Sequence, residues 1–246
     1  MEKLLNTLGI DNSCKAEDFK HGKTLLINKP YSWSSFDVVN KIRIQFKNHL
    51  GIKKIKVGHA GTLDPLATGL LIICTGKATK TIDQLMGMDK EYVAHITFGA
   101  STPSYDLETE PDQYFKTEHI THEKLEKTLS QFLGIQMQSP PIFSAIKKNG
   151  KKAYEQARKG EKIKLDKREI EIKELELLEY TNDTAIVRVV CSKGTYIRSF
   201  AHDLGIALKS GAHLSGLKRT AIGNSKLESA LSIEQFEKIL TTIQTI

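Results

Sequence analysis

One acid and one imidazole stand in a short segment that suits neither a regular helix nor a strand. The segment runs from residue 57 to residue 69, contains His59 and Asp64, and reads VGHAGTLDPLATG. Its glycines and proline break both regular structures, and the residue before a proline is driven out of the helical region. We therefore predict a stiff loop that holds Asp64, a candidate catalytic acid, in a fixed place and leads into the buried apolar strand at 70–75.

Two other interpretations of this loop must be weighed. Aspartate before proline is common turn chemistry, so Asp64 could serve only to cap a turn. A phosphate-binding loop needs the spacing Gly-x-x-x-x-Gly-Lys-Ser/Thr, and the stretch Gly76-Lys77-Ala78-Thr79 lacks the upstream glycine. A nucleotide P-loop is therefore not expected.

The whole chain has the composition of an ordinary globular protein with a polyanionic partner. Its 246 residues suit one large domain or a domain with an insertion, and its net charge of +7 favours nucleic acid. The cysteines at 14, 74 and 191 form no Cys-x-x-Cys pair, which argues against a disulfide scaffold or a zinc site. No apolar run approaches the ~20 residues of a membrane span. We expect a cytoplasmic protein without metal or cofactor.

Regular elements are expected on both sides of the loop. A strand at 23–30 should precede a helix that Ser34 or Ser35 caps, with apolar residues at helical spacing. Those apolar residues are Phe36, Val39, Ile42 and Phe46. A helix at 78–86 should turn Ile82, Leu85 and Met86 inward, and a strand at 92–98 should bury alternate residues from Tyr92 onward.

The second half predicts two further helices, a hairpin and a capped last helix. Thr121 should cap a helix that Gly134 closes, and a strand hairpin should turn at 180–183. The next helix carries Arg198, which by spacing alone is a surface cation. A buried nucleophilic aspartate, however, needs a cationic partner, and a guanidinium suits a planar carboxylate. Ser232 should begin the last helix with a capping box.

Positive charge is concentrated in one segment, at about 139–168. From Lys147 to Arg168 the segment contains ten basic residues and only three acidic ones. Tyr154 lies among them, and Phe143 lies just before the segment. A solvated lysine face is the ordinary explanation of such a run. Its concentration in one segment favours contact with an RNA backbone instead. If this segment makes no such contact, Lys77, Lys80 and Lys90 beside the loop are the next candidates.

Several motifs resemble those of the bacterial tRNA pseudouridine-55 synthase (TruB-type) family. The loop is similar to the family's catalytic motif, GHxGxLDPLATGxL followed by KATK. Further similar strings are LLINKPxxWSSFDVVNKIR, the K-x-Y that ends at Tyr92, PPxFSAxKxxGKKAYExARKG and KGTYIRSFAxDLG. The resemblance runs from about Lys23 to Thr220, and its motifs occur in the family's order.

The resemblance implies the fold, the reaction and a set of site residues. The implied fold is α/β (α+β), the pseudouridine synthase fold, with a bent, mixed and largely antiparallel sheet, flanking helices and a basic insertion. The implied reaction isomerises uridine 55 in the T loop of tRNA by base flipping. Asp64 would be the nucleophile, Arg198 its partner, and Tyr92 the ring that stacks on the base and takes a proton later. His59, Tyr196 and Leu217 would bind the substrate.

Further residues receive roles at the edge of the site. Lys29, Thr62 and Pro65 would be structural residues near the loop. The candidates for contact with the RNA are Lys80, Lys147, Lys148, Lys151, Lys152, Arg158 and Lys159. The resemblance leaves open whether Asp64 attacks ribose C1′, adds to uracil C6, or assists elimination through a glycal.

The expected domain organisation is that of a short family member. Residues 1–20 would be an N-terminal extension, and 21–246 the catalytic domain with its insertion at about 139–168. Many members continue into a small C-terminal RNA-binding (PUA) domain, but only 26 residues follow Thr220, which are too few for one. We expect a monomer that binds the T arm of tRNA and no membrane.

Two rival functions remain. A non-catalytic RNA-binding protein or chaperone on the same fold would explain the charge, but not why the Asp64 loop and Arg198 are both intact. A glycosidase acting on a soluble sugar usually needs two carboxylates that flank the bond, and this loop has one. A pseudouridine assay on unmodified tRNA separates all three.

Overall fold

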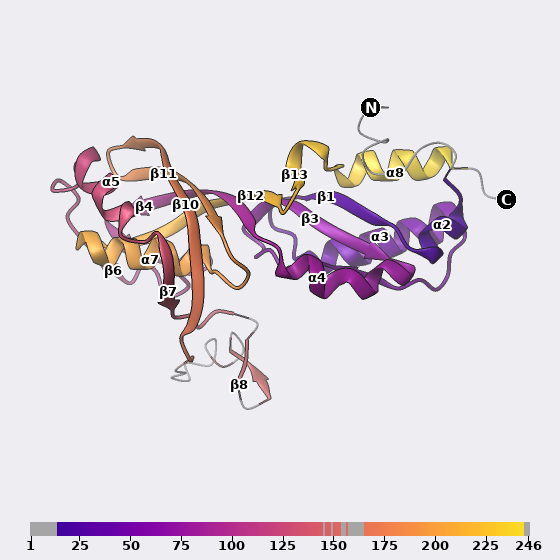
Figure 1. The fold of residues 1–246 in the computed structure, drawn as a ribbon, viewed down its shortest axis with the longest axis horizontal. Helices are drawn as coiled ribbons and strands as arrows, with labels where there is room; N and C mark the ends of the chain where they lie inside the picture. Colours follow the sequence, from indigo (N-terminus) through magenta and orange to yellow (C-terminus); the bar gives the residue numbers. More distant parts are fainter. Residues whose placement is uncertain (1–13, 145, 149, 154–155, 157–164, 244–246) are drawn as a thin grey trace. The chain divides into compact units, whose positions relative to one another are not determined.

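The computed structural model describes residues 14–144, 146–148, 150–153, 156 and 165–243. The chain divides into two compact units, the first made of 1–91 and 218–246 and the second of 92–217. Figure 1 shows helices and strands in both units. The strands β4 (Lys90–Phe98) and β12 (Ala212–Ile222) each have residues in both units.

The first unit packs helices around two long strands and the hairpin that carries the loop. Its strands are hydrogen-bonded in the order β1-β3-β12, with β2 also on β3 and β13 on β12. The antiparallel pair of β1 and β3 joins Thr24 to Cys74 and Lys29 to Gly69. The further elements of this unit are α2 (Ala16–His21), β1 (Thr24–Lys29), α3 (Ser35–Leu50), β2 (Val57–His59), β3 (Ala67–Thr75), η1 (Gly76–Thr81), α4 (Ile82–Gly87), β13 (Ser225–Lys226), η2 (Leu227–Ser229) and α8 (Ile233–Thr242).

Aromatic rings form the centre of this unit's core. Phe46 of α3 lies between Phe19 of α2, at 4.9 Å between ring centres, and Phe236 of α8, at 5.8 Å. Phe19 is fully buried, so the segment expected to be an N-terminal extension contributes a helix to the core. Of the two serines expected to cap α3, Ser34 does so, in a capping box, and the capping box predicted at Ser232 is present.

Two inward positions expected in this unit are wrong. Met86 of α4 is 44% exposed, and Phe36 of α3 is 58% exposed. The other expected residues of α3, Val39, Ile42 and Phe46, are buried together with Val38, where the helix packs against α8 and β2. The helix expected at 78–86 is a 3-10 turn, η1, followed by the short α4.

In its described residues, the second unit is a sheet with the helices α5 (His122–Ser130) and α7 (Ile197–Leu208) packed on it. Its strands are hydrogen-bonded in the order β12-β4-β11-β10-β7. As predicted, β4 buries Tyr92, Ala94, Ile96 and Phe98. Phe132, just after α5, packs against Phe200 of α7, with ring centres 5.4 Å apart. The further elements of this unit are β5 (Ala100–Ser101), β6 (Gln113–Tyr114), α5 (His122–Ser130), β7 (Gly134–Gln138), β8 (Lys147–Lys148), β9 (Lys151–Lys152), β10 (Arg168–Thr181), β11 (Thr184–Cys191) and α7 (Ile197–Leu208).

Candidate active site

The Asp64 loop connects the two strands of a hairpin. Val57 of β2 pairs with Thr75 of β3, and His59 pairs with Ile73. The loop closes in a turn in which the Ala67 N–H donates to the carbonyl of Asp64 at 3.0 Å. The predicted loop and the buried strand after it are therefore both present, and the strand begins at Ala67 rather than at residue 70.

The residues on either side of Asp64 are held by side chains from the first unit. The buried Ser35 hydroxyl accepts from the Leu63 N–H at 2.8 Å and lies 3.1 Å from the Leu63 carbonyl, to which it donates. The Pro65 carbonyl accepts from the Ser32 N–H at 3.0 Å and from the Lys29 ammonium at 3.3 Å. Because the residues before and after Asp64 are both tethered, its carboxylate stands on a backbone with little freedom to move.

Arg219 ties the two ends of the loop together. Its side chain is buried, and it donates from Nε to the Leu70 carbonyl at 2.8 Å and from Nη2 to the Gly61 carbonyl at 3.0 Å. Gly69, with φ +104°, lies so close to the backbone of Arg219 that a Cβ there would come within 2.3 Å of its carbonyl oxygen. The sequence analysis assigned no role to Arg219, because its partners are far away along the chain.

Lys29 is a buried cation beneath the loop. Its ammonium group donates to the carbonyls of Trp33 at 2.5 Å, Pro30 at 3.0 Å and Pro65 at 3.3 Å. The pKa of Lys29 is lowered from 10.5 to about 8; burial is the largest cause and the positive charge of Arg219 acts in the same direction, whereas the negative charges of Asp64 and Asp37 oppose the shift. The ammonium group of Lys29 therefore interacts electrostatically with the Asp64 carboxylate.

The lowered pKa of Lys29 predicts how stability depends on pH. Between about pH 8 and 10.5 the folded protein binds fewer protons than the unfolded chain, whose lysine keeps the pKa of 10.5. The contribution of Lys29 to the free energy of unfolding should therefore rise with pH across this window. Urea unfolding at pH 7.5 and pH 10 measures this rise. The free energy of unfolding of the wild type minus that of Lys29→Met should be more positive at pH 10 than at pH 7.5.

The control for this measurement is Lys116→Met, at an exposed lysine of the second unit. It reports how the removal of an exposed lysine changes the free energy of unfolding at each pH. If the free energy of unfolding of the wild type minus that of Lys29→Met stays constant or becomes less positive toward pH 10, the lowered pKa of Lys29 is contradicted.

His59 lies at the end of β2 as a neutral ring. Burial, and then the positive charge of Arg219, lower the pKa of His59 below its usual 6.5. Its Nδ1 atom is buried and has no hydrogen-bond partner among the described residues. An imidazole in this setting stays uncharged at neutral pH.

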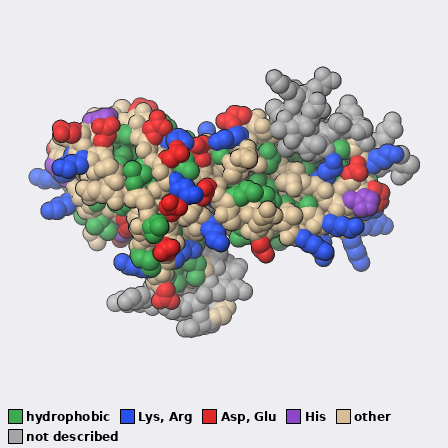
Figure 2. Space-filling view, viewed as in Figure 1, with side chains coloured by type: hydrophobic (Ala, Val, Ile, Leu, Met, Phe, Trp, Pro, Cys, Tyr) green, Lys and Arg blue, Asp and Glu red, His purple; other side chains and the backbone are tan. Residues whose placement is uncertain are grey.

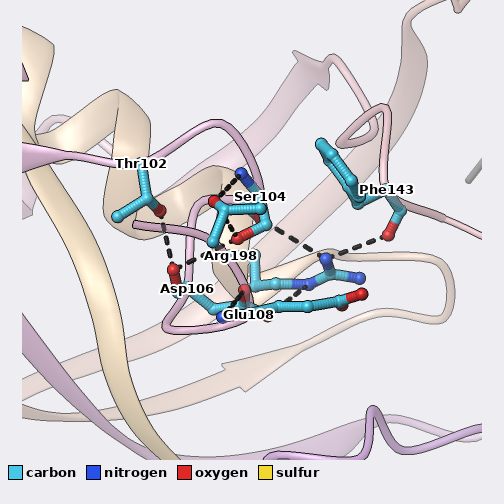
Figure 3. A network of polar contacts seen from close by, with 7 residues as sticks. Thr102, Ser104, Asp106, Glu108, Phe143 and Arg198 are labelled. Carbon is cyan, nitrogen blue, oxygen red and sulfur yellow. Dashed lines mark hydrogen bonds and ion pairs between the residues drawn. The ribbon is translucent and has the colours of Figure 1, made fainter. Parts of the chain in front are cut away.

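Arg198 lies at the centre of a polar network in the second unit (Figure 3). Its Nη1 atom donates to the Ser104 carbonyl at 3.3 Å and to the Phe143 carbonyl at 3.0 Å, and its Nε atom lies 3.6 Å from Asp106 Oδ2. The two side chains of the ion pair are only 4% and 6% exposed. Arg198 is therefore not the surface cation that its spacing alone suggested.

Asp106 is a candidate site residue that the sequence analysis missed. It lies in the polar segment 100–118, which contains none of the predicted site residues. The Asp106 carboxylate also accepts from the Glu108 N–H at 3.0 Å, and the Asp106 carbonyl accepts from the hydroxyls of Thr102 at 2.7 Å and Ser104 at 3.1 Å (Figure 3). The nearby hydroxyl residues were the one signal of an ordered turn, but nothing local pointed to Arg198.

The other expected pocket residues belong to the second unit too. Tyr92 is buried on β4, and Leu217, half-buried, stands on the neighbouring strand β12. Tyr196 is held at the start of α7, where its N–H and carbonyl both bond to the Gln138 side chain, at 2.8 and 3.0 Å. The guanidinium carbon of Arg168 lies 4.3 Å from the centre of the Tyr196 ring.

A model of the TruB family of pseudouridylate synthases (N-terminal domain) matches residues 47–197. The chain is 56% identical to tRNA pseudouridine synthase B of Phocaeicola vulgatus over 91% of its own length and 95% of that protein's. It is 54% identical to the protein of the same name from Flavobacterium johnsoniae, over 91% of this chain and 98% of that one. The chain belongs to the TruB family of pseudouridylate synthases.

Two solved structures are similar to this TruB family member as a fold. One is described as an H/ACA RNP bound to a substrate RNA containing 2′-deoxyuridine, with TM-score 0.65, 26% identity and coverage of 90% of this chain and 54% of that one. The other is a Cbf5-Nop10-Gar1 complex, with TM-score 0.66, 26% identity and coverage of 94% and 62%. This chain therefore spans less than two thirds of each of these two solved chains.

These matches settle the broader expectations. The family, the mixed α/β pseudouridine synthase fold, and an isomerase that forms pseudouridine in tRNA are all confirmed.

No helix in the described part of the chain is long and apolar enough to cross a membrane. The described residues also contain no cluster of three or more side chains of the kinds that hold metal ions.

The structure does not bring together all the predicted site residues. Asp64 belongs to the first unit and Arg198 to the second, so their pairing stays a prediction. Thr62 and Lys80 are exposed, whereas Lys90 is buried and donates to the Met86 and Met88 carbonyls at 2.6 and 2.5 Å, so it is no surface contact for RNA.

The basic insertion is only partly described. Lys147 and Lys148 form β8, which pairs antiparallel with Lys151 and Lys152 of β9. The predicted contacts Arg158 and Lys159 lie outside the described residues.

Proposed function

We propose that this protein isomerises uridine 55 in the T loop of tRNA, with Asp64 as the nucleophile or its electrostatic equivalent. The observation that carries the proposal is the tethering of Leu63 and Pro65 on either side of Asp64, in a chain of this family. Catalysis by a nucleophile needs its reacting oxygen at a fixed position, and side-chain tethers on both neighbours supply that.

The reaction rearranges one glycosidic bond. The bond from ribose C1′ to uracil N1 breaks, the base rotates, and a bond from C1′ to C5 forms. C5 then loses its proton, and N1 takes one up, so the product is an isomer of the substrate. The carboxylate of Asp64 can serve by attack on C1′, by addition to C6, or by assisting elimination through a glycal. An uncharged Asp64 could do none of these.

Arg198 is proposed to keep Asp64 ionised and aimed. The observations in its support are the burial of Arg198 and the carbonyls of Ser104 and Phe143 that hold its guanidinium. A guanidinium held in place in this way presents fixed donors to a carboxylate. Asp106 is a positioning residue in this scheme, because it bonds to Arg198 and to the turn around it. Lys29 adds a second positive charge near Asp64 from the first unit.

The remaining side chains are proposed to receive the flipped base. Tyr92 stacks on the uracil ring and takes a proton in the later steps, and Tyr196 and Leu217 line the pocket. A base can only reach Asp64 after leaving the stack of the T loop, and an aromatic face holds it there. The neutral ring of His59 is suited to the space that the nucleotide leaves, since it brings no charge into the stack. Thr62 and Pro65 shape the loop.

The insertion at about 139–168 is proposed to bind the T arm of the tRNA through its phosphates. The proposed contacts are Lys147, Lys148, Lys151, Lys152, Arg158 and Lys159, with Lys80 near the loop. The protein is proposed to act as a monomer in the cytoplasm. Ten basic residues in a stretch of 22 support the binding of tRNA by the insertion, because each cation that contacts a phosphate releases counterions.

The insertion predicts a measurable change in salt dependence. Replacing Lys151, Lys152, Arg158 and Lys159 by Gln should raise the Kd for tRNA strongly at moderate salt. The slope of log affinity against log salt should flatten by roughly 0.7–0.9 for each side chain that meets a phosphate. Filter binding from 50 to 300 mM KCl measures this slope. A slope equal to that of the wild type would show that these four side chains contact solvent rather than phosphates.

One experiment tests the function itself. The protein is incubated with unmodified tRNA, and pseudouridine at position 55 is assayed. Product at this position supports the proposal. Binding without product would favour the non-catalytic RNA-binding rival, and pseudouridine at another position would overturn the choice of uridine.

A further inference from the structure

A second basic region lies in the first unit, outside the insertion. Between Asp37 and Asp64 the chain has no acidic residue and six basic ones, namely Lys41, Arg43, Lys47, Lys53, Lys54 and Lys56. Lys41 is 3.7 Å from Glu237 of α8, on the side of α3 that faces that helix. The other five lie on α3 or on the segment 51–56 that follows it.

Four of these cations surround a hollow at the end of α3. The helix ends at Gly51, which adopts the left-handed conformation, and Ile52 then turns into the core. Lys53, Lys54 and Lys56 are exposed, and together with Arg43, Ile52 and Ile55 they line an open hollow of about 410 Å³. Arg43 is fixed there, because its Nη2 atom donates to the Val57 carbonyl at 2.8 Å. The hollow thus has an apolar part and a positively charged rim.

An exposed aromatic ring continues this surface toward the Asp64 loop. Phe36 is 58% exposed, and the guanidinium carbon of Arg43 lies 6.0 Å from the centre of its ring. Phe36, Arg43 and Lys47 are spaced at i, i+7 and i+11, so they share one face of the helix. The residue before Phe36 is Ser35, which tethers Leu63 beside Asp64. The surface therefore begins next to the catalytic loop and runs along α3, which is roughly 24 Å long.

We propose that this α3 surface, consisting of Phe36, Arg43, Lys47, Lys53, Lys54 and Lys56, binds the substrate RNA at a place separate from the insertion. The cations at the hollow bind backbone phosphates, and Phe36 stacks on an unpaired base. The inference rests on the proposed function, since it takes tRNA as the partner. On the face drawn in Figure 2, blue side chains are numerous along the lower edge of the first unit.

RNA fits this surface better than a simple anion or a membrane. An aromatic face flanked by a guanidinium is the usual platform for a nucleic acid base, whereas a free phosphate has no use for it. A membrane-binding surface would present several apolar side chains toward the lipid, but the two isoleucines of the hollow are buried or half-buried. The surface also belongs to the same helix that positions the catalytic loop, where substrate RNA must come.

The test removes the charges of the hollow and compares salt dependence. The variant carries Lys53→Gln, Lys54→Gln and Lys56→Gln, and the matched control carries Lys116→Gln, Lys124→Gln and Lys127→Gln at exposed lysines of the second unit. Binding of unmodified tRNA is measured from 50 to 300 mM KCl. We expect the hollow variant to bind at least tenfold more weakly at the lowest salt and to lose up to roughly two or three units of salt slope. The control should stay within about twofold of the wild type.

A second variant tests the stacking. Phe36→Ala should weaken tRNA binding by about five- to a hundredfold and leave the salt slope unchanged, because no charge is lost. Ile44→Ala, at an exposed apolar residue of the same helix, is its control. Thermal unfolding of each variant shows whether it is folded.

Backbone footprinting of the bound tRNA separates this surface from the insertion. The hollow variant should lose protection at nucleotides different from those that the insertion variant loses. Unchanged affinity and slope in the hollow variant would overturn the proposal, as would lost protection at the same nucleotides. Lost binding to anionic lipid vesicles with tRNA binding intact would also overturn it. Because all these readouts are of binding, they hold even if the assay for pseudouridine at position 55 fails.

Discussion

Asp64→Asn should abolish pseudouridine formation and leave tRNA binding within about tenfold of the wild type, or ~1.4 kcal/mol. The amide cannot act as an anionic nucleophile, whereas the proposed phosphate contacts lie on other residues. The fold of the loop should survive, because its tethers act on Leu63, Pro65 and Gly61 rather than on the carboxylate. Single-turnover formation of pseudouridine and tRNA binding measure the two effects separately.

The control for this variant is Asp83→Asn, at an exposed acid of α4 in the same unit. It removes the same charge without touching the loop and should keep near-normal turnover. Residual activity above one percent in a clean preparation of Asp64→Asn would rule out the nucleophile assignment. A large loss of tRNA affinity would instead place Asp64 in the binding surface.

Arg198→Lys should lose most activity although the charge is kept, with a fall in turnover of more than about tenfold. A lysine cannot bond to the Ser104 and Phe143 carbonyls and still offer parallel donors to a carboxylate, because its ammonium is a single point of charge. Turnover is measured at saturating tRNA, so that weaker binding does not enter. Near-full activity would show that charge alone suffices and that the proposed pairing with Asp64 is wrong.

Asp106→Asn tests whether the buried charge of Asp106 is needed to position Arg198. It leaves Arg198 in place with its two carbonyl acceptors but removes the buried counter-charge at 3.6 Å. We expect a loss of stability of about 3–5 kcal/mol, as when a buried ion pair loses one member. Turnover should fall less than in Arg198→Lys. Glu110→Gln, at an exposed acid of the same segment, is the control and should change neither.

The features that the sequence by itself determined are those that depend on neighbours a few residues apart. The capping boxes at Ser34 and Ser232 and the cap at Thr121 close within one helical turn. The alternation of β4 from Tyr92 to Phe98 is a property of the strand itself. The irregular backbone of the Asp64 loop follows from its glycines and proline, and the recurrence of several long motifs in one order identified the family.

Tertiary structure decided which partner each buried polar group would find. Ser35, predicted only as a possible cap, bonds to Leu63, 28 residues away; Arg198 bonds to Ser104, 94 residues away; and Arg219 bonds to Gly61, 158 residues away. Each guanidinium or hydroxyl has many acceptors available in principle, and only the packing of strands and helices selects one. Packing also placed Phe36 in solvent, because α8 and β2 cover the opposite side of α3.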